Sequence, residues 1–400
     1  MTFTELLTPT DVPAQWTRAV DADRVPQAVL LAGPAGSELL PLTLRLLQYL
    51  QCTDRRRGNN GFGESCQACE ACRGSEGLVH PDVHFTFPVV GTGATSADQL
   101  PQWRAAVTAN PYLSQGDWLR AQTTDNKQGN INREEVMRIL HDVSLQRFTE
   151  GYKAVVVWGA DFLGEESNRL LKVIEEPPAR TCIFLVTHRP DRILPTIVSR
   201  CRVYRVPPPP AAAIARMLAT RGAEAERAAD LAHAAGGDLA LALSSLDGGD
   251  GEDSGKTPTV AAWLRACFAG RGAGIVKAGH ALAAQTREQQ KHYLLRALRF
   301  VRELGVARAG TPRPLRLGPS DREVADKLSR LLDWRQLTAL ADELNGLVAA
   351  VERNANGKIA FVAASIRLHH ILAQRSGDAP PSPRVPATAA AAQTPTGRAS

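Results

Sequence analysis

The sequence has few aromatic residues, no long hydrophobic run and no unusual content of glycine or proline. Aromatic residues make up 5% of the chain, which argues against a β-sandwich and favours helical layers. The 32 glycines and 26 prolines are too few for a fibrous or linker-dominated protein. No apolar segment approaches the roughly 18–20 residues that cross a bilayer, and no signal peptide opens the chain. We therefore expect a soluble cytoplasmic protein without a membrane partner.

Charge of either sign is also not in large excess. The chain has 47 Lys and Arg against 41 Asp and Glu, a net charge of +6. This small excess fits an ordinary solvated surface, but it leaves contact with nucleic acid or with an acidic partner open. Because 400 residues exceed what one hydrophobic core usually serves, we expect two or three domains.

Seven cysteines, an odd number, do not suggest a disulfide framework in a protein of this size. Four of them, with the spacing C-x13-C-x2-C-x2-C, are Cys52, Cys66, Cys69 and Cys72. Four thiolates can surround a zinc ion, and a complete shell implies a structural and not a catalytic metal. We expect structural Zn²⁺ in a module over residues 52–72; an iron–sulfur cluster and surface thiols are the alternatives. The remaining cysteines, Cys182, Cys201 and Cys267, are expected to be small buried apolar residues.

Near-continuous apolar runs predict strands that are buried on both faces. These runs are residues 28–32, 153–158 and 181–187. Helical stretches lie between them, and one of these, residues 165–176, is expected to stop at Pro177 and Pro178. The alternation predicts an α/β domain with a mostly parallel sheet over residues 1–206.

A run of prolines at 207–210 predicts a stiff joint. Residues 207–246 are Ala-rich and predict a small helical domain, whereas the acidic, glycine-rich segment 247–258 predicts a flexible linker. Residues 259–375 predict a third, helical domain, and residues 376–400 a disordered tail. The apolar stripes of the third domain are Leu294, Ala297, Leu298, Val301 and Leu304, then Leu337, Leu340, Leu344, Leu347 and Val351.

The first predicted strand leads into Gly-Pro-Ala-Gly-Ser-Glu-Leu-Leu, where a phosphate-binding loop would stand. Such a loop has the form G-x-x-x-x-G-K-[ST], since the Lys neutralises phosphates and the hydroxyl binds magnesium. Gly33 keeps the first position, and Gly36 lies inside the loop. However, Glu38, Leu39 and Leu40 replace the second Gly, the Lys and the Ser/Thr. The loop therefore lacks the side chains that bind a nucleotide.

The second predicted strand lacks acidic residues at its end. A nucleotide hydrolase places an acidic pair there to hold magnesium, but this strand ends in Trp158 and Gly159, and Asp161 comes about three residues too late. We expect this chain neither to bind nor to hydrolyse ATP.

Further strings of sequence carry a family resemblance. They are His80-Pro81-Asp82, Asn168-Arg169-Leu170-Leu171-Lys172-Val173-Ile174-Glu175-Glu176-Pro177-Pro178 and Ser199-Arg200-Cys201. Together with the cysteine cluster they resemble the AAA+ clamp-loader subunits of bacterial DNA polymerase III. The inert loop beside a retained Ser-Arg-Cys is similar to the delta-prime family. The resemblance covers about residues 25–206.

The resemblance implies an AAA+ domain, a helical lid over 207–246 and a helical collar over 259–375. It also implies that Arg200, flanked by Ser199 and Cys201, is an arginine finger that reaches the ATP of a neighbouring subunit. The implied partners are gamma/tau and delta subunits in a hetero-oligomer, and through that complex the sliding clamp and primer–template DNA. The alternative for Arg200 is an ordinary pair with a local carboxylate.

Other functions stay open on the sequence. An active gamma/tau-type ATPase would need a Lys at position 39, and relatives of that type place a phosphate-sensing Arg near Ala240. A zinc-stapled DNA-binding or repair mediator that uses the same fold is the second alternative. Residues 88–128 resemble an insertion, to which the sequence assigns no function.

Overall fold

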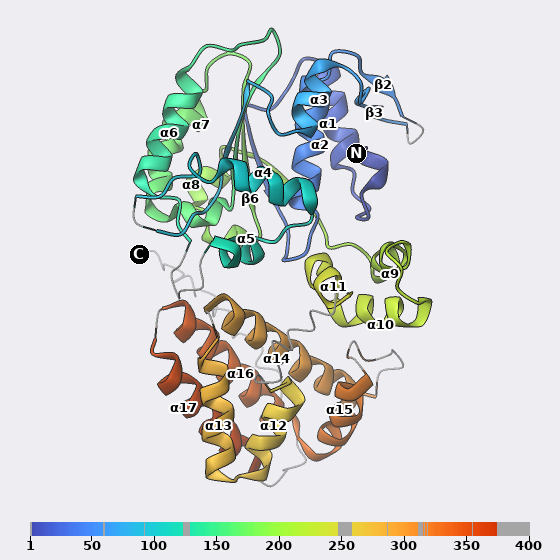
Figure 1. The fold of residues 1–400 in the computed structure, drawn as a ribbon, viewed down its shortest axis with the longest axis vertical. Coiled ribbons are helices and arrows are strands. Elements are labelled where there is room, and N and C mark those ends of the chain that lie inside the picture. The colour runs from blue at the N-terminus through green and yellow to red at the C-terminus, as the bar shows by residue number, and fades with distance from the viewer. Residues whose placement is uncertain are drawn as a thin grey trace, which may run out of the picture.

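The computed structural model describes residues 2–373 apart from 59–60, 92, 123–128, 247–257, 286, 311–314, 316, 318 and 354. An α/β domain is followed by a small helical unit and by a larger helical bundle (Figure 1). Most of the predicted linker 247–258 and the predicted tail 376–400 lie outside the described residues. Within the described part of the chain, no helix combines the length and apolarity that crossing a membrane requires.

The α/β domain is built on a five-stranded sheet with the order β4-β5-β6-β1-β7, and every pair in it is parallel. The strands are β1 (Ala28–Ala32), β4 (Val83–Thr86), β5 (Lys153–Trp158), β6 (Thr181–Thr187) and β7 (Arg202–Arg205). The three strands predicted from apolar runs are thus confirmed. The two outer strands, β4 and β7, are short and carry polar side chains, so no continuous apolar run marks them.

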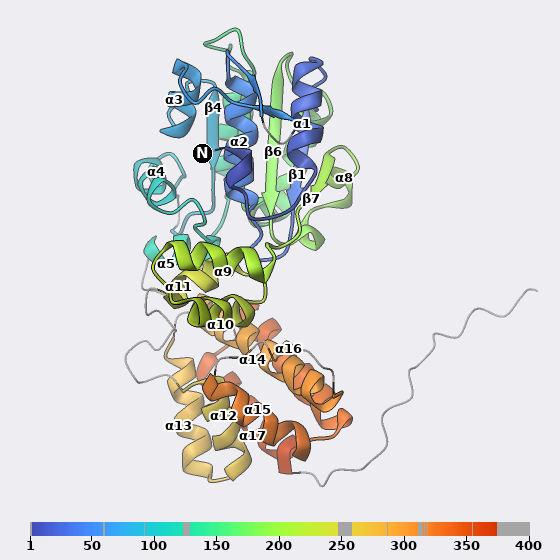
Figure 2. The ribbon, with the colours of Figure 1, turned by 90° about the vertical axis from the view of Figure 1, so that its right-hand side faces the viewer.

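Alternate residues of the central strands enter two separate cores. Val29, Val156 and Phe184 face the first core, which is closed by helices α1 (Val12–Asp21), α2 (Leu39–Gln51), α4 (Leu100–Ala109) and α5 (Gln115–Gln122). Leu30, Val155 and Ile183 face the second core, beneath α6 (Arg133–Ser144), α7 (Leu171–Glu175) and α8 (Pro195–Val198). Helices therefore cover both faces of the sheet, as the sequence predicts: Figure 1 shows α6 and α7 on one side of it, and Figure 2 looks onto the other side, with α1 and α2 over the strands.

The segment 165–176 is helical up to Glu175, as predicted, but the helix starts earlier and is divided into two types. The chain forms a 3₁₀ helix, η2, at Ala160–Leu170, and only then the short α7. Gly164 interrupts η2 in the left-handed region at φ 51°. The Ser167 hydroxyl donates to the Gly164 carbonyl three residues back, over 2.6 Å, which favours the tighter helix. The predicted stop before Pro177 is correct within one residue.

The rest of the described chain is helical. Helices α9 (Ala211–Thr220), α10 (Ala225–Ala235) and α11 (Leu239–Leu246) enclose a small core of their own. A larger core lies among α12 (Val260–Ala269), α13 (Gly272–Ala283), α14 (Arg287–Arg308), α15 (Pro319–Leu331), α16 (Trp334–Glu352) and α17 (Gly357–Ala373). Both predicted apolar stripes point into that larger core, on α14 and α16. The exact limits of the domains stay predictions.

Candidate functional site

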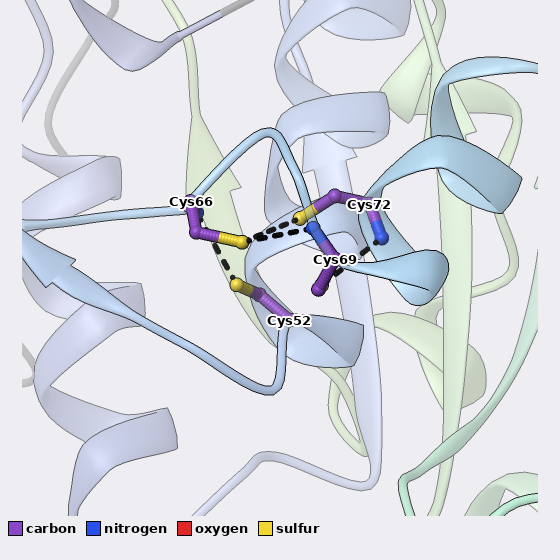
Figure 3. Close-up of side chains that lie close together, drawn as sticks. All are labelled: Cys52, Cys66, Cys69 and Cys72. Carbon is purple, nitrogen blue, oxygen red and sulfur yellow. Dashed lines mark hydrogen bonds between the residues drawn. The ribbon is translucent and has the colours of Figure 1, made fainter.

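The four clustered cysteines meet beside the first core. Cys52 ends helix α2, and Cys69 and Cys72 lie at the start of helix α3 (Glu70–Glu76), while Cys66 follows the hairpin of β2 (Arg56–Arg57) and β3 (Gly63–Glu64). Their sulfur atoms all lie within 4.8 Å of one another (Figure 3). A tetrahedral Zn(Cys)₄ shell, with Zn–S bonds of about 2.3 Å, has S···S edges of about 3.8 Å. The sequence prediction that these four residues form one cluster is confirmed.

The surroundings of the cluster suit thiolates. The backbone N–H groups of Ala68 and Cys69 donate to the Cys66 sulfur and lower the pKa of that thiol. Burial opposes ionisation of Cys69, but hydrogen bonds from Thr53 and Cys72 outweigh it and lower the pKa of the Cys69 thiol to about 6. Burial raises the pKa of the other two thiols. The four cysteines form no disulfide and are compatible with a structural metal.

The loop after β1 is filled by the protein itself. Gly36 has φ 84°, and a Cβ atom built on it would lie 2.2 Å from the Cα atom of Asp238, at the start of α11. Glu38 is buried, and its carboxylate accepts hydrogen bonds from the backbone N–H groups of Leu7 at 3.1 Å and Thr8 at 2.6 Å. Glu38, which stands where a phosphate-binding loop has its second Gly, is therefore a structural anchor for the N-terminal segment.

The space left at this loop is small. The cavity between Ser37, Tyr112, Trp158 and Ala240 has a volume of about 30 Å³, whereas ligand pockets usually hold about 300–1,000 Å³. The loop is closed from the sheet side by His188, whose Nδ1 donates to the Pro34 carbonyl over 3.0 Å, and burial lowers the pKa of this histidine.

The end of β5 offers no metal ligand. Trp158 is buried, and Gly159 adopts φ 84°, where a Cβ atom would lie 3.1 Å from Pro88. Asp161 is also buried, and both of its oxygens are used: Thr187 donates to one at 2.8 Å, and Arg189 to the other at 2.8 Å. Asp161 thus holds an arginine and is not free for magnesium.

Arg200 and this loop lie at opposite ends of two neighbouring strands. The loop follows the carboxyl end of β1, whereas Arg200 precedes the amino end of β7, and these strands are parallel. Arg200 therefore does not face the loop of its own chain. Its side chain is half-exposed, pairs with Glu175, and donates to the Thr196 carbonyl over 2.9 Å. A local carboxylate partner, the alternative kept open on the sequence, is thus present in this chain.

The two residues that flank Arg200 have lesser contacts. The Ser199 hydroxyl donates to the same Thr196 carbonyl over 3.1 Å. Cys201 is only partly buried, so the expectation of full burial is correct for Cys182 and Cys267 and too strong for Cys201.

Sequence reasoning missed several residues that organise these sites. Asp238, Arg189 and Glu352 come from three separate parts of the chain, and Glu352 pairs with Arg189 at 3.5 Å. No spacing or motif marks such long-range partners. Asp82 lies in the His-Pro-Asp string, so a signal existed, but nothing in that string told its structural role.

Comparison with known proteins gives a consistent family. The family model described as DNA polymerase III, delta subunit, matches residues 9–210. DNA polymerase III subunit delta' of Escherichia coli is 27% identical over 190 residues, which are 47% of this chain and 45% of that protein. The Bacillus subtilis subunit delta' is 25% identical over 191 residues, 48% of this chain and 45% of the relative.

A gamma/tau subunit of Mycobacterium tuberculosis is 26% identical over 209 residues, 52% of this chain but 29% of the relative. The chain thus aligns with about half of the length of the delta' relatives and with less of this one. Since the family model matches more than half of the 400 residues, this chain belongs to the DNA polymerase III delta subunit family.

Proposed function

We propose that this chain is the delta-prime type, non-hydrolysing subunit of a replicative clamp loader. It assembles with gamma/tau and delta subunits into a hetero-oligomer in the cytoplasm that loads the sliding clamp onto primer–template DNA. The AAA+ domain would then contact neighbouring subunits and would bind no nucleotide of its own. The helical units, as lid and collar, would hold it in the ring.

The filled loop is the observation that carries this proposal. A phosphate would have to occupy the space beside Gly36 that the backbone of Asp238 already fills. It would also face the buried carboxylate of Glu38 without a Lys to balance the charge. Binding would thus require both a displaced helix start and a new cation.

A direct binding measurement tests the degenerate site. We expect no saturable binding of a fluorescent ATP analogue with Mg²⁺, and no gain in binding for Leu39→Lys, because Asp238 still fills the loop. An isolated gamma/tau subunit serves as the positive control. Saturable ATP binding by the unmodified chain would instead support the gamma/tau-type alternative.

Arg200 would act in trans in this proposal. It is half-exposed at the amino end of β7, away from the loop after β1. Its pair with Glu175 is a surface ion pair, which typically contributes about 0–1 kcal/mol to stability. A neighbour's γ-phosphate, with more negative charge, can displace such a carboxylate. A finger of this type is worth roughly 10³–10⁵ in rate at the site it serves.

The test of Arg200 uses the reconstituted loader. Arg200→Ala should abolish clamp loading and remove the ATPase contribution of the one site that it serves. The matched control is Arg169→Ala, since Arg169 is another exposed arginine paired with a carboxylate, Glu166, at 2.7 Å. Equal clamp loading by both variants would remove the finger from the proposal.

The metal of the cysteine cluster would be Zn²⁺ in this proposal. Cys52, Cys66, Cys69 and Cys72 would hold it, and its chemistry would be structural, as four thiolates leave no open position. The ion would tie the β2–β3 hairpin and helix α3 to the end of α2.

The second alternative is a stand-alone DNA-binding mediator. It is separated from the loader by co-purification with polymerase subunits. Recovery of the chain without gamma/tau or delta, under conditions that retain a control loader, would favour the mediator.

A further inference from the structure

A basic groove lies beside the cysteine cluster, away from the loop and from Arg200. It has a volume of about 610 Å³, much larger than the cavity at the loop. Its walls come from helix α1, the end of α2 and the β2–β3 hairpin, which stands at the outer edge of the α/β domain (Figure 1). The lining cations are Arg18, Arg55, Arg56 and Arg57.

The positive charge of the groove is poorly balanced. Among its lining residues Asp21 is the one acid, and its carboxylate already accepts the hydroxyl of Tyr49 at 2.7 Å. Asp54 lies next to the groove and pairs with Arg56 at 3.1 Å, but both side chains are more than 60% exposed. Such an exposed pair exchanges partners at little cost. The lining residues alone, four arginines and Asp21, carry a net charge of +3, and Asp54 beside them lowers it to +2.

One of the four arginines, Arg55, is fixed to the end of α2, and Arg57 lies on the paired strand β2. Arg55 donates to the carbonyls of Tyr49 at 3.1 Å and Leu50 at 3.0 Å, in the last turn of α2, and its guanidinium lies 5.4 Å from the centre of the Tyr49 ring. Arg57 pairs in register with Gly63, so no side chain from the opposite strand covers it. Gly63 cannot be larger, because a Cβ atom there would lie 2.0 Å from the Tyr49 hydroxyl.

These features favour a phosphodiester backbone over an acidic peptide. All four lining cations are arginines, whose planar forks bind phosphate oxygens through two hydrogen bonds. Phe62 and the glycine backbone on either side of it supply an apolar wall on which a sugar or base can rest. A purely acidic peptide would make little use of that wall.

We propose that this groove is a binding site for the phosphate backbone of DNA, and that the cysteine cluster holds the hairpin in the position that binding requires. The site belongs to this chain alone and involves neither Arg200 nor the loop after β1. Its failure would therefore leave the proposed loader function standing.

The test measures DNA binding by the full, metal-loaded chain with fluorescence anisotropy. The probes are a labelled single-stranded oligonucleotide and the matching duplex, titrated between about 50 and 200 mM salt. The variant is Arg56→Gln with Arg57→Gln. The matched control is Arg216→Gln with Arg227→Gln, which removes the same charge from two exposed residues of the lid helices α9 and α10.

We expect the hairpin variant to weaken binding at least tenfold and the control variant to change it less than twofold. Loss of two phosphate contacts should also lower the slope of log K against log salt by about 1.4 on a single strand and about 1.8 on a duplex. The probe with the higher affinity identifies which form of DNA the groove takes.

Three outcomes would overturn the proposal: no DNA binding, equal weakening by both variants, or tighter binding of a poly-glutamate peptide than of either DNA. Should the hairpin variant lose its metal, arginine modification of the unaltered chain by phenylglyoxal decides. DNA should then protect the peptide that contains Arg55 to Arg57, and an unprotected peptide would contradict the site.

Discussion

At the scale of single residues, Asp82 shows how a recognised string can have an unrecognised role. Its carboxylate is buried and accepts hydrogen bonds from the backbone N–H groups of Phe148 and Thr149, at 2.6 and 2.7 Å, and from the Thr149 hydroxyl at 2.6 Å. It therefore fixes the connection between α6 and β5 to the start of β4. The string His-Pro-Asp supports the family resemblance, but only the folded chain shows that its acid binds a loop 66 residues away.

Asp82→Asn should destabilise the α/β domain by about 2–3 kcal/mol at pH 7, because an amide accepts at one atom only and turns its own N–H groups toward at least one of the three donors. Chemical denaturation monitors the change. Asp326→Asn, at an exposed acid on α15, is the control and should cost less than about 0.5 kcal/mol. Equal stability of the two variants would contradict the role of Asp82.

The same carboxylate predicts a pH dependence. Burial opposes its ionisation, but the Thr149 hydroxyl and the two N–H groups outweigh burial and lower the pKa of Asp82. Its contribution is then fully present above the unfolded pKa of about 3.9 and is lost as the pH falls through the lower folded value. The difference in unfolding free energy between wild type and Asp82→Asn should shrink below about pH 4. A difference that stays constant to pH 2 would exclude this origin.

At the scale of elements, the sequence predicts best where one physical cause dominates. Strands β1, β5 and β6 are apolar on both faces because both faces are covered. Their bounds follow from the positions of the apolar runs in the sequence. Strand β7, at an edge of the sheet, is exposed at both ends and has one fully buried residue, Tyr204. The 3₁₀ helix η2 depends on the backbone of Gly164 and on the hydrogen bond of the Ser167 hydroxyl. In neither segment does the sequence contain an apolar pattern strong enough to predict the observed structure in place of a loop or an ordinary α-helix.

The candidate sites divide in the same way. The spacing of the four cysteines predicts the cluster, since a local motif brings them together. The missing side chains of the loop also predict an inert site. What fills the loop could not be predicted, because Asp238 comes from a helix about 200 positions later in the chain and no motif links the two segments.

The cysteine cluster predicts a local effect of metal removal. With the proposed zinc at this cluster, Cys72→Ser should lower the metal content from about one equivalent per chain to nearly none, because three thiolates and an alcohol hold zinc far less well. Residues 53–65 should then become sensitive to protease while the sheet stays folded, since its core is built mainly from other elements and the hairpin packs only Phe62 against it. Elemental analysis and limited proteolysis measure both effects.

Cys201→Ser is the control, since Cys201 lies outside the cluster, and it should keep its metal and its protease resistance. If elemental analysis finds iron in the wild type, the four cysteines hold an iron–sulfur cluster and not zinc. Full zinc content in Cys72→Ser would show that the cluster is not the binding site.

At the scale of the whole molecule, ion pairs join the α/β domain to the larger helical bundle. Buried Asp161 pairs with Arg189 at 2.7 Å, and Arg189 in turn contacts Glu352 at the end of α16. Arg192 pairs with the same glutamate at 2.6 Å. Arg189 therefore lies between two carboxylates and connects the end of β5 and the exit of β6 to the end of α16.

The small helical unit is joined to the larger bundle by a second set of ion pairs. Arg322 on α15 pairs with Asp230 on α10 at 2.7 Å, and Arg299 on α14 lies 3.6 Å from Asp238. Asp238 also packs against Gly36 in the loop. A movement of the collar would thus reach the loop through the lid, although each contact is weak alone.

Glu352→Gln should loosen the junction between the α/β domain and the collar without unfolding either. Both partners are partly exposed, with Glu352 at 28% and Arg192 at 43%, so the cost in stability should stay near or below about 1 kcal/mol. The orientation of the two parts should respond more strongly, because one carboxylate holds two arginines. Small-angle scattering at low salt should give a larger radius of gyration for the variant than for the wild type.

Salt and a matched variant separate this effect from a general loss of charge. Raising the salt concentration screens the pairs, so the wild type should expand toward the variant while Glu352→Gln changes little. Glu343→Gln removes a similar pair, since Glu343 contacts Arg367 at 2.8 Å, but both of those residues lie within the collar. Its scattering should match the wild type at every salt concentration. If Glu352→Gln matches the wild type as well, the helical units are held to the α/β domain by their apolar contacts, and the ion pairs only follow that arrangement.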